Sequence, residues 1–279
     1  MERKYTSDKL KTARDTGSTL PWRLPTKDLV LGSDEVHVWR ASLDLEISQI
    51  QILQPTLTAD ERARAGRFYF QKDREHFIVA RGLLRVILGH YLRMEPSKLR
   101  FCYGNHGKPA LAREVGGDGL RFNSTRSHGL ALYAITRNRE IGVDLERVRP
   151  GVAEEHIAEQ FFSPREADTL RALPINTRKE AFFNCWTRKE AYMKAKGEGL
   201  SLPTNRFEVS LVPGEPAALL STDGDPQEAS HWSLQELTPG PGFVGALAVE
   251  GTGWRPEFWE WPGIIIKSGM TYSYQPPGA

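Results

Sequence analysis

Hydrophobic residues in the first half of the chain follow two different spacings. Over residues 36–45 they occupy every second position, which is typical of a strand with one face in the core. Over residues 72–92 they recur three and four positions apart, which predicts a long amphipathic helix. Thr58, followed by two acidic residues, predicts the start of a shorter helix before it. Further strands are expected at residues 99–103, 120–123, 130–136 and 140–145.

The second half of the chain repeats this order of elements. Its patterns predict helices at residues 153–162 and 165–172 and a longer helix at 177–196, which ends at Gly197. Strands are expected at residues 207–211, 231–237 and 243–249. Because each half combines a short helix, a long helix and antiparallel strands, the sequence predicts an α+β fold of two pseudo-symmetric halves.

On this interpretation the chain divides into four segments. Residues 1–33 are polar and basic and predict a flexible N-terminal arm. An N-terminal α+β lobe is expected at residues 34–149 and a C-terminal α+β lobe at residues 150–250. Residues 251–279 form a tail that contains tryptophans among prolines and glycines, and we expect its rings to pack back onto the body.

The composition of the 279-residue chain excludes several classes of protein. It has 37 Lys and Arg against 35 Asp and Glu, and this net charge of +2 argues against a nucleic-acid binder, despite a short basic run near the N-terminus. Hydrophobic residues make up 39% of the chain, which is enough to fill a core. No apolar run reaches the roughly 18 residues of a membrane span, and no apolar stretch near the N-terminus suggests a secretory signal. We therefore expect a cytoplasmic protein with neither membrane nor nucleic acid as a partner.

The number and positions of the cysteines exclude two further kinds of structure. The chain has two cysteines, Cys102 and Cys185, which exclude a disulfide framework. Neither belongs to a Cys/His cluster, so a structural zinc site has no ligands. We expect both to be buried thiols in a reducing compartment.

Asp144 and Glu146 form the first candidate site. Side chains alternate along a strand, so these two carboxylates face the same side, while Val143 and Leu145 face the core. Two like charges on one face repel each other unless a cation lies between them. Carboxylate oxygens suit Mg²⁺, which commonly binds through a few carboxylates and substrate phosphates. Acidic pairs are also common on solvated strand faces, so the spacing alone leaves both interpretations open.

The predicted helix at 177–196 carries the second candidate site. Phe183, Trp186, Glu190 and Lys194 recur three and four positions apart and therefore share one stripe. The stripe begins apolar and becomes ionic near the end of the helix, where ionisable groups need a compensating ion, ligand or partner. An ordinary surface Glu–Lys pair remains the alternative.

Two further segments carry cations. Residues 104–109 (GNHGKP) place Lys108 in a glycine-containing loop, and residues 122–127 (FNSTRS) place Arg126 at a strand. Glycine allows a bulky anion to approach the backbone, and lysine and arginine supply charge to phosphate oxygens. Neither segment matches the Walker A or the GxGxxG pattern. An ordinary polar loop explains each segment equally well when it is taken alone.

Together these segments resemble the signature motifs of phosphopantetheinyl transferases. The sequences GVDLE at 142–146 and WTRKEAYMKAKGEGLSLP at 186–203 are similar to the family's signature pair. NHGKP at 105–109, FNSTRSHGLALYA at 122–134 and the segment RFY at 67–69 also fit, in the same order. The resemblance covers residues 36–250 and is to the monomeric, two-lobed type that activates surfactin synthetase.

The resemblance implies a coenzyme A cleft between two pseudo-symmetric lobes. Enzymes of this family move the phosphopantetheine arm of coenzyme A onto a serine of an apo acyl or peptidyl carrier protein and release adenosine 3′,5′-bisphosphate. By position, Asp144, Glu146 and Glu190 would hold magnesium, and Glu190 is alternatively the base that accepts the serine proton. Lys194 would contact a phosphate at the reacting centre. Lys108 matches the family's coenzyme-binding lysine, and Arg64 lies near its positions for the 3′-phosphate.

One departure from the family pattern bears on activity. Thr125 and Arg126 stand where the family usually has Ser-His. Arginine carries a permanent charge and a planar fork, so we expect coenzyme binding to survive with altered geometry or pH dependence. The departure also suggests the alternative function, a non-catalytic module that binds coenzyme A or a carrier protein through a decayed site. The three carboxylates and Lys194 are all present, which favours the active enzyme.

Overall fold

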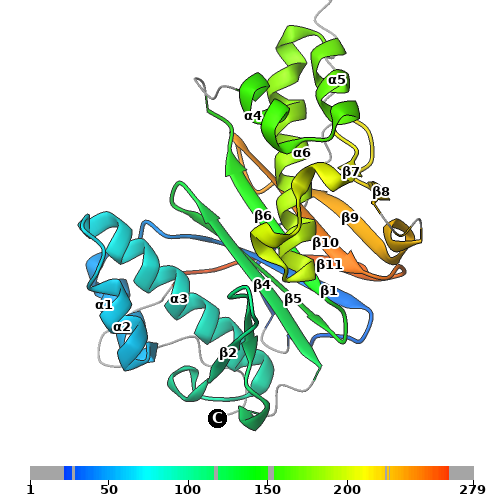
Figure 1. Cartoon of the computed structure of the whole chain (residues 1–279). Helices are drawn as coiled ribbons and strands as arrows, with labels where there is room; N and C mark the ends of the chain where they lie inside the picture. The colour runs from blue at the N-terminus through cyan, green and yellow to red at the C-terminus, as the bar shows by residue number, and fades with distance from the viewer. Residues whose placement is uncertain are drawn as a thin grey trace, which may run out of the picture.

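The computed structural model describes residues 22–26, 29–115, 119–149, 154–223, 225 and 227–263. Most of the expected N-terminal arm and the last part of the C-terminal tail therefore lie outside the described residues. The described part of the chain forms an α+β fold with two main sheets and helices on both outer sides (Figure 1), which confirms the predicted fold class.

The first main sheet has the strand order β11-β1-β5-β4. Its strands are β1 (Glu35–Ser42), β4 (Leu120–Ser127), β5 (Leu130–Arg137) and β11 (Arg255–Glu260). Three helices belong to this half: α1 (Ile47–Leu53), α2 (Ala59–Ala65) and the long α3 (Gln71–Leu92). A small hairpin of β2 (Phe101–Tyr103) and β3 (Pro109–Leu111) follows α3.

The second main sheet has the strand order β6-β10-β9. Its strands are β6 (Ile141–Arg147), β9 (Trp232–Leu237) and β10 (Phe243–Glu250). The long helix α6 (Ile175–Lys196) lies across it, with α4 (Glu154–Phe161) and α5 (Pro164–Ala172) at its N-terminal end (Figure 1). A short antiparallel pair, β7 (Phe207–Val209) and β8 (Leu219–Thr222), completes this half.

Side chains that point alternately to the two faces of each strand arrange the helices and sheets in four layers. In β1, Trp39 and Ala41 pack toward α3, whereas Val36 and Val38 pack toward the second sheet. In β10, the alanines at 246 and 248 pack toward α6, and Leu247 and Val249 pack toward the first sheet. The order is therefore helix, sheet, sheet, helix, with one apolar core at each of the three interfaces.

Local signals explain most element boundaries. Thr58 and Ser163 each form a capping box with the glutamate three residues later, which fixes the starts of α2 and α5. Gly197 ends α6 in the left-handed conformation (φ 72°), as predicted. Four of these elements were not predicted, namely α1, β3, β8 and β11. The helix α1 has only seven residues, and Pro256 hides the alternation of β11, which is an edge strand where proline is tolerated.

The placement of β6 differs from the sequence-based division at residue 150. That division assigns the acidic strand to the N-terminal lobe, but β6 hydrogen-bonds to β10 in the second sheet. The halves therefore separate between β5 and β6, at the turn near Asn138, where φ is positive. The sequence-based division was misled because β6 follows β5 after a short turn. Such a turn permits the two strands to pair but does not require it.

Three other observations concern the expectations from composition. Cys185 is buried, but Cys102 is exposed, so the expectation of two buried thiols was wrong for Cys102. Trp259 and Trp261 are buried in the core beside α3, which ties the start of the tail to the body. Across the described residues, no helix combines the length and apolar character needed to cross a membrane.

Candidate active site

Helix α6 lies unusually close to strand β6 because Gly142 has no side chain. A Cβ atom at this position would lie 2.0 Å from the carbonyl oxygen of Ala191 and 2.4 Å from the backbone nitrogen of Ala195. Gly142, Asp144 and Glu146 occupy every second position of β6 and therefore share the face that is turned toward α6. The close approach therefore brings the end of the helix over the two acidic side chains.

Lys194 of α6 contacts Asp144 directly. Its Nζ donates to Oδ1 of Asp144 at 2.6 Å and to Oγ1 of Thr125 at 3.4 Å. Thr125 donates to the same Asp144 oxygen at 3.2 Å. Asp144 is buried, whereas the Lys194 side chain is 30% exposed, so the carboxylate of this ion pair is withdrawn from water and the ammonium group is not. The strand acid and the helix cation predicted from separate motifs are thus in contact.

Glu146 and Glu190 complete an acidic group around this pair. Burial raises the pKa of Glu146 above its ordinary value, and the charge of Asp144 raises it further. Burial also raises the pKa of Glu190; the charge of Lys194 opposes this shift, and Asp144 and Glu146 reinforce it. The negative charges of these carboxylates therefore disfavour one another's ionisation, and the ammonium group of Lys194 opposes this effect.

The donor set fits a hard divalent cation. Oδ2 of Asp144 is buried without a hydrogen-bond partner, although buried acceptors are normally paired. Oxygen ligands with surplus negative charge are what Mg²⁺ prefers. Nevertheless, no three Asp, Glu, His or Cys side chains among the described residues converge into a ready-made metal cluster. Lys194 instead provides positive charge beside Asp144.

Strand β4 supplies a row of polar groups beside β6. Asn123, Thr125 and Ser127 share one face, and each reaches across to β6. Oδ1 of Asn123 accepts from the Val143 backbone N–H at 3.0 Å, and Oγ of Ser127 donates to Glu146 at 3.2 Å. These side chains bridge two strands that have no backbone ladder between them within the described part of the chain.

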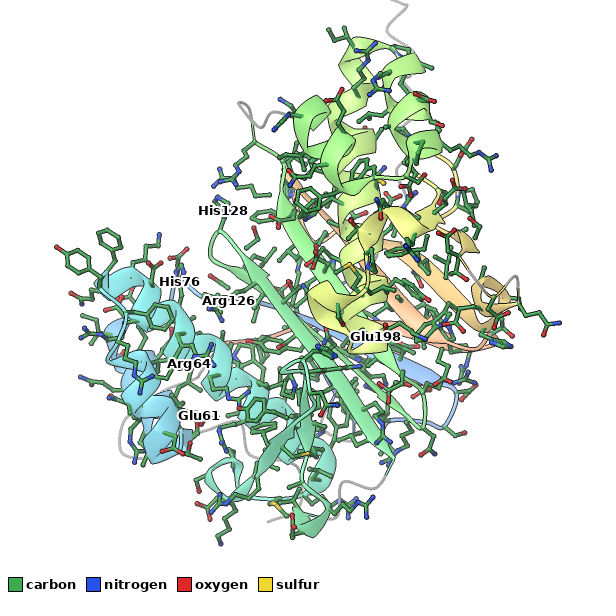
Figure 2. All side chains as sticks on the ribbon, viewed as in Figure 1. Glu61, Arg64, His76, Arg126, His128 and Glu198 are labelled. Carbon is green, nitrogen blue, oxygen red and sulfur yellow. The ribbon has the colours of Figure 1, made fainter. Side chains whose placement is uncertain are left out.

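Arg126 faces the opposite side of β4, toward α3. Its guanidinium carbon lies 6.0 Å from the ring centroid of Phe77, and that of Arg64 lies 5.5 Å from the same ring. Figure 2 shows Arg64 of α2, His76 of α3 and Arg126 of β4 on one side of the molecule, with His128 at the end of the β4–β5 hairpin. Arg64 and Arg126, predicted from distant segments, thus gather around one aromatic side chain.

A cavity of about 420 Å³ opens beside Arg126. Its basic lining comes from α3, β4, the hairpin and β6, with Asp73 as the one acidic residue; the basic residues are Lys72, His76, Arg126, His128 and Arg147. Such a lining attracts anions and is suited to phosphate. Lys72 and His76 both contact Asp44, which holds the pKa of that carboxyl group low.

Lys108 lies at the other end of β4. Its Nζ donates to Glu140 at 2.8 Å and to the backbone carbonyl of Ala195 at 2.7 Å. It lines a second cavity of about 740 Å³ together with Arg121 and Lys196. The two cavities share no lining residue, and the Asp144–Lys194 contact lies against Thr125, on the stretch of β4 between them.

Sequence reasoning found part of this arrangement. The structure brings Thr125, Asp144 and Lys194 into contact, and it couples them to Glu146 and Glu190. Arg64 and Arg126 meet at Phe77, whereas Lys108 stands apart from both groups. The contributions of Asn123, Ser127, Lys72 and His76 were not predicted. The alternation of Asn123, Thr125 and Ser127 was the available signal for the first two.

Two family models match adjoining segments of the chain. Residues 140–248 match the 4′-phosphopantetheinyl transferase superfamily, and residues 39–137 match the N-terminal part of 4′-phosphopantetheinyl transferases. The junction between the matches falls between β5 and β6, where the hydrogen bonding also divides the fold.

Several named proteins are similar over most of their length. The 4′-phosphopantetheinyl transferase HetI of Nostoc sp. is 46% identical over 240 residues, which cover 86% of this chain and 98% of HetI. The transferase Sfp of Bacillus subtilis is 29% identical, over 56% of this chain and 66% of Sfp. The human L-aminoadipate-semialdehyde dehydrogenase-phosphopantetheinyl transferase is 25% identical, over 76% of this chain and 72% of the human protein. Among solved structures, Thermotoga maritima holo-[acyl-carrier-protein] synthase matches with a TM-score of 0.33 and 23% identity, over 40% of this chain and 63% of that chain.

Proposed function

The chain belongs to the 4′-phosphopantetheinyl transferase superfamily, and from this premise we propose how its residues carry out the transfer. The protein is a transferase that moves phosphopantetheine onto carrier proteins. We propose coenzyme A as the donor and a serine of an apo acyl or peptidyl carrier protein as the acceptor. The other product is then adenosine 3′,5′-bisphosphate.

One observation carries the assignment of the reaction centre. Lys194 and Thr125 meet on Asp144, and the second oxygen of that carboxylate is buried without a partner beside two glutamates of raised pKa. This surplus of oxygen ligands supports a Mg²⁺ site formed by Asp144, Glu146 and Glu190. Bound there, Mg²⁺ would neutralise charge that develops on the pyrophosphate oxygens.

The basic groups on either side of this centre support the placement of coenzyme A. We assign the coenzyme's phosphates to the 420 Å³ cavity, with Arg126, which lines it, and Arg64, which lies near the same Phe77 ring, as contacts for the 3′-phosphate. Lys108 would contact the coenzyme beyond the reaction centre, at the 740 Å³ cavity. An extended ligand that lies along β4 can reach both ends, since the strand spans about 3.3 Å per residue.

The chain's own groups then perform the reaction. The carrier serine attacks the phosphorus atom that bears the pantetheine arm, so a bond from serine Oγ to phosphorus forms and the bond to the bridging oxygen of the diphosphate breaks. As the alternative to binding Mg²⁺, Glu190 accepts the serine proton, because its raised pKa in the metal-free site makes it a better base than an ordinary carboxylate. Lys194 moves from Asp144 to a phosphate oxygen and stabilises its charge.

The decayed-site alternative has less support. Thr125, which stands at the family's serine position, contacts Asp144, and Arg126, at the family's histidine position, lies beside Arg64. Thr125 and Arg126 therefore still supply a hydroxyl group and a cation next to the proposed reaction centre.

A transfer assay tests the proposal. The protein is incubated with coenzyme A, Mg²⁺ and an apo carrier protein, and the carrier is weighed by mass spectrometry. We expect a gain of one phosphopantetheine group, which is lost when EDTA is added and when the carrier serine is replaced by alanine. Absence of a mass gain with both acyl and peptidyl carriers, in a protein that still binds coenzyme A, would instead support the binding module.

The same proposal bears on the oligomeric state of the protein and on its location in the cell. A monomer is sufficient, because one chain contributes both sheets and both cavities to the site. A cytoplasmic location is consistent with coenzyme A as substrate and with two cysteines that form no disulfide.

A further inference from the structure

The turn between α2 and α3 exposes two adjacent aromatic rings. The side chain of Tyr69 is 91% exposed and that of Phe70 is 65% exposed. The rings contact each other edge to face, with centroids 5.0 Å apart. Burial of such rings normally contributes strongly to stability, so a contiguous exposed pair is typical of a surface that another molecule covers.

Basic residues flank these rings in the sequence. Residues 62–74 contain five basic residues and a single acid, Asp73. Arg67 and Arg74 are exposed and form no ion pair with any carboxylate in the described ranges, although Lys72 close by is paired with Asp44. We name the surface formed by Arg67, Tyr69, Phe70 and Arg74 the aromatic–arginine rim.

The composition of the rim favours a protein as its partner. Tyrosine, phenylalanine and arginine are enriched in protein–protein interfaces and dominate their binding energy. A phosphate group alone needs cations, and it would leave the two rings exposed. The rim therefore fits a surface that presents both acidic and apolar side chains.

The rim also lies beside the proposed coenzyme site. Phe68 and Lys72, which flank the two rings in the sequence, both line the 420 Å³ cavity with Arg126. Figure 1 shows α2 and α3 on one side of the β4–β5 hairpin and the helices of the other half on its far side. The cavity adjoins the reaction centre, because Ser127 lines it and donates to Glu146 of the acidic group.

We propose that the aromatic–arginine rim is a docking surface for the carrier protein. This inference rests on the proposed function, because it takes the acceptor to be a protein. The carrier would place an apolar side chain against Tyr69 and Phe70 and acidic side chains against Arg67 and Arg74. The position of the rim beside the cavity supports this occupant, and its arginines require acidic side chains on the docking face.

Direct binding tests the inference independently of turnover. The probes are an apo acyl carrier protein and an apo peptidyl carrier protein, each with its serine replaced by alanine, and the full chain is titrated by calorimetry. Two double variants separate the apolar and ionic contributions: Tyr69→Ser with Phe70→Ser, and Arg67→Glu with Arg74→Glu. We expect each to weaken carrier binding about tenfold or more, the effect of losing contacts worth about 1.4 kcal/mol.

Matched controls come from the other half of the protein. Leu220 is 52% exposed on β8, and Arg206 is an exposed arginine without an ion pair to a described carboxylate. Leu220→Ser and Arg206→Glu should leave carrier binding within twofold of the unmodified protein. Added salt should weaken binding of the unmodified protein more than that of the Arg67→Glu, Arg74→Glu variant.

The possible outcomes distinguish the docking surface from other roles. Carrier binding that is weakened in both double variants, with coenzyme A affinity unchanged, supports the inference. Unchanged carrier binding, or no measurable binding of either carrier by the unmodified protein, overturns it. A parallel loss of coenzyme A affinity also overturns it, because the rim would then belong to the coenzyme site. Since no step of this test requires transfer, failure of the proposed chemistry is recorded separately by the mass assay.

Discussion

Glu190 lies partly buried on α6, and this burial raises the pKa of its side chain; the charge of Lys194 opposes the shift, whereas Asp144 and Glu146 add to it. The proposed mechanism uses this basicity to accept the proton of the carrier serine. Glu190→Gln removes the base while keeping the shape of the side chain. We expect transfer to fall by at least about 100-fold, the usual contribution of a general base. The mass assay with coenzyme A and carrier protein measures the loss, and near-normal turnover would remove Glu190 from the mechanism.

The same substitution should stabilise the metal-free protein. Because the pKa of Glu190 is higher in the folded protein than in the unfolded chain, its ionised form costs stability at neutral pH. As the pH falls through the raised pKa, the folded state takes up the proton first and this cost disappears. Glu190→Gln should therefore raise Tm by roughly 1–3 °C at pH 7.5, and the difference should shrink toward pH 5. Thermal unfolding at several pH values without Mg²⁺ measures it, and a lower Tm for the variant would contradict the assumed repulsion.

Lys194 occupies the position of a counter-ion in the metal-free site. Its ammonium lies 2.6 Å from Asp144 and must compete with any cation that binds the same carboxylate. Lys194→Met should therefore bind Mg²⁺ about tenfold more tightly in the absence of coenzyme A, since removal of one nearby charge changes affinity by about 1.4 kcal/mol or more. The same variant should bind coenzyme A more weakly.

Calorimetric titration with Mg²⁺ provides the measurement for Lys194. Lys196→Met is a suitable control, because Lys196 pairs with Glu228 rather than with the acidic group. Unchanged or weaker Mg²⁺ binding in Lys194→Met, with the control unaffected, would show that Asp144 is not a ligand.

Individual site residues were predicted where a motif fixes the spacing. The strand motif predicted that Asp144 and Glu146 share a face, and the helix motif predicted one stripe for Glu190 and Lys194. The role of Gly142 was not predicted, because its function depends on the distance between two backbones. The same limitation applies to Lys72 and His76, whose place in the cavity is set by tertiary packing.

At the scale of elements, α6 carries a structural ion pair as well as the proposed site. Lys189 precedes Glu190 but points elsewhere, with its Nζ 2.7 Å from Glu166 of α5, and each residue is about 3% exposed. Glu166 also accepts the backbone N–H groups of Ser163 and Val209. This one carboxylate therefore joins α5, α6 and β7.

Removal of Lys189 should destabilise the protein strongly. Lys189→Met leaves Glu166 buried without its counter-charge, which typically costs about 3–5 kcal/mol of unfolding free energy. Arg171→Met is the matched control, because its partner Asp168 is 77% exposed and such surface pairs contribute about 1 kcal/mol or less. Urea unfolding compares the two variants, and equal losses would show that the Lys189 pair has no special role.

Most elements were predicted from the sequence because their own patterns define them. The capped helices α2 and α5 and the long helices α3 and α6 are where periodicity and capping place them. Short elements such as α1 and β8 depend on tertiary contacts, and their few residues carry too little periodicity to predict. The strand β11 is stabilised by parallel pairing with β1, more than 200 residues earlier in the chain, which a local pattern cannot reveal.

At the scale of the whole molecule, the proposed site lies where the two main sheets diverge. Strand β4 is the edge of the first sheet and β6 is the edge of the second. A sequence-based interpretation placed both strands in one lobe, because nothing in the alternation of β6 specifies which edge it joins. The space between β4 and β6 matters for function. It is spanned by side chains rather than by a backbone ladder, and these side chains can also contact a ligand.

Substitution of Asn123 tests whether side-chain hydrogen bonds hold β4 and β6 in place. Its Oδ1 accepts the Val143 N–H at 3.0 Å, and Asn123 is only 6% exposed. Asn123→Ala leaves a buried N–H without a partner, which costs about 1–3 kcal/mol. We expect faster hydrogen exchange at Val143 and weaker binding of coenzyme A, because Thr125 and Arg126 on the same strand lose their support. Amides in the β6–β10 ladder serve as the internal control, since their hydrogen bonds are backbone to backbone. Exchange that accelerates equally throughout both sheets would indicate a general loss of stability, whereas a change confined to the space between β4 and β6 would show that Asn123 holds the two halves in the arrangement on which the transfer depends.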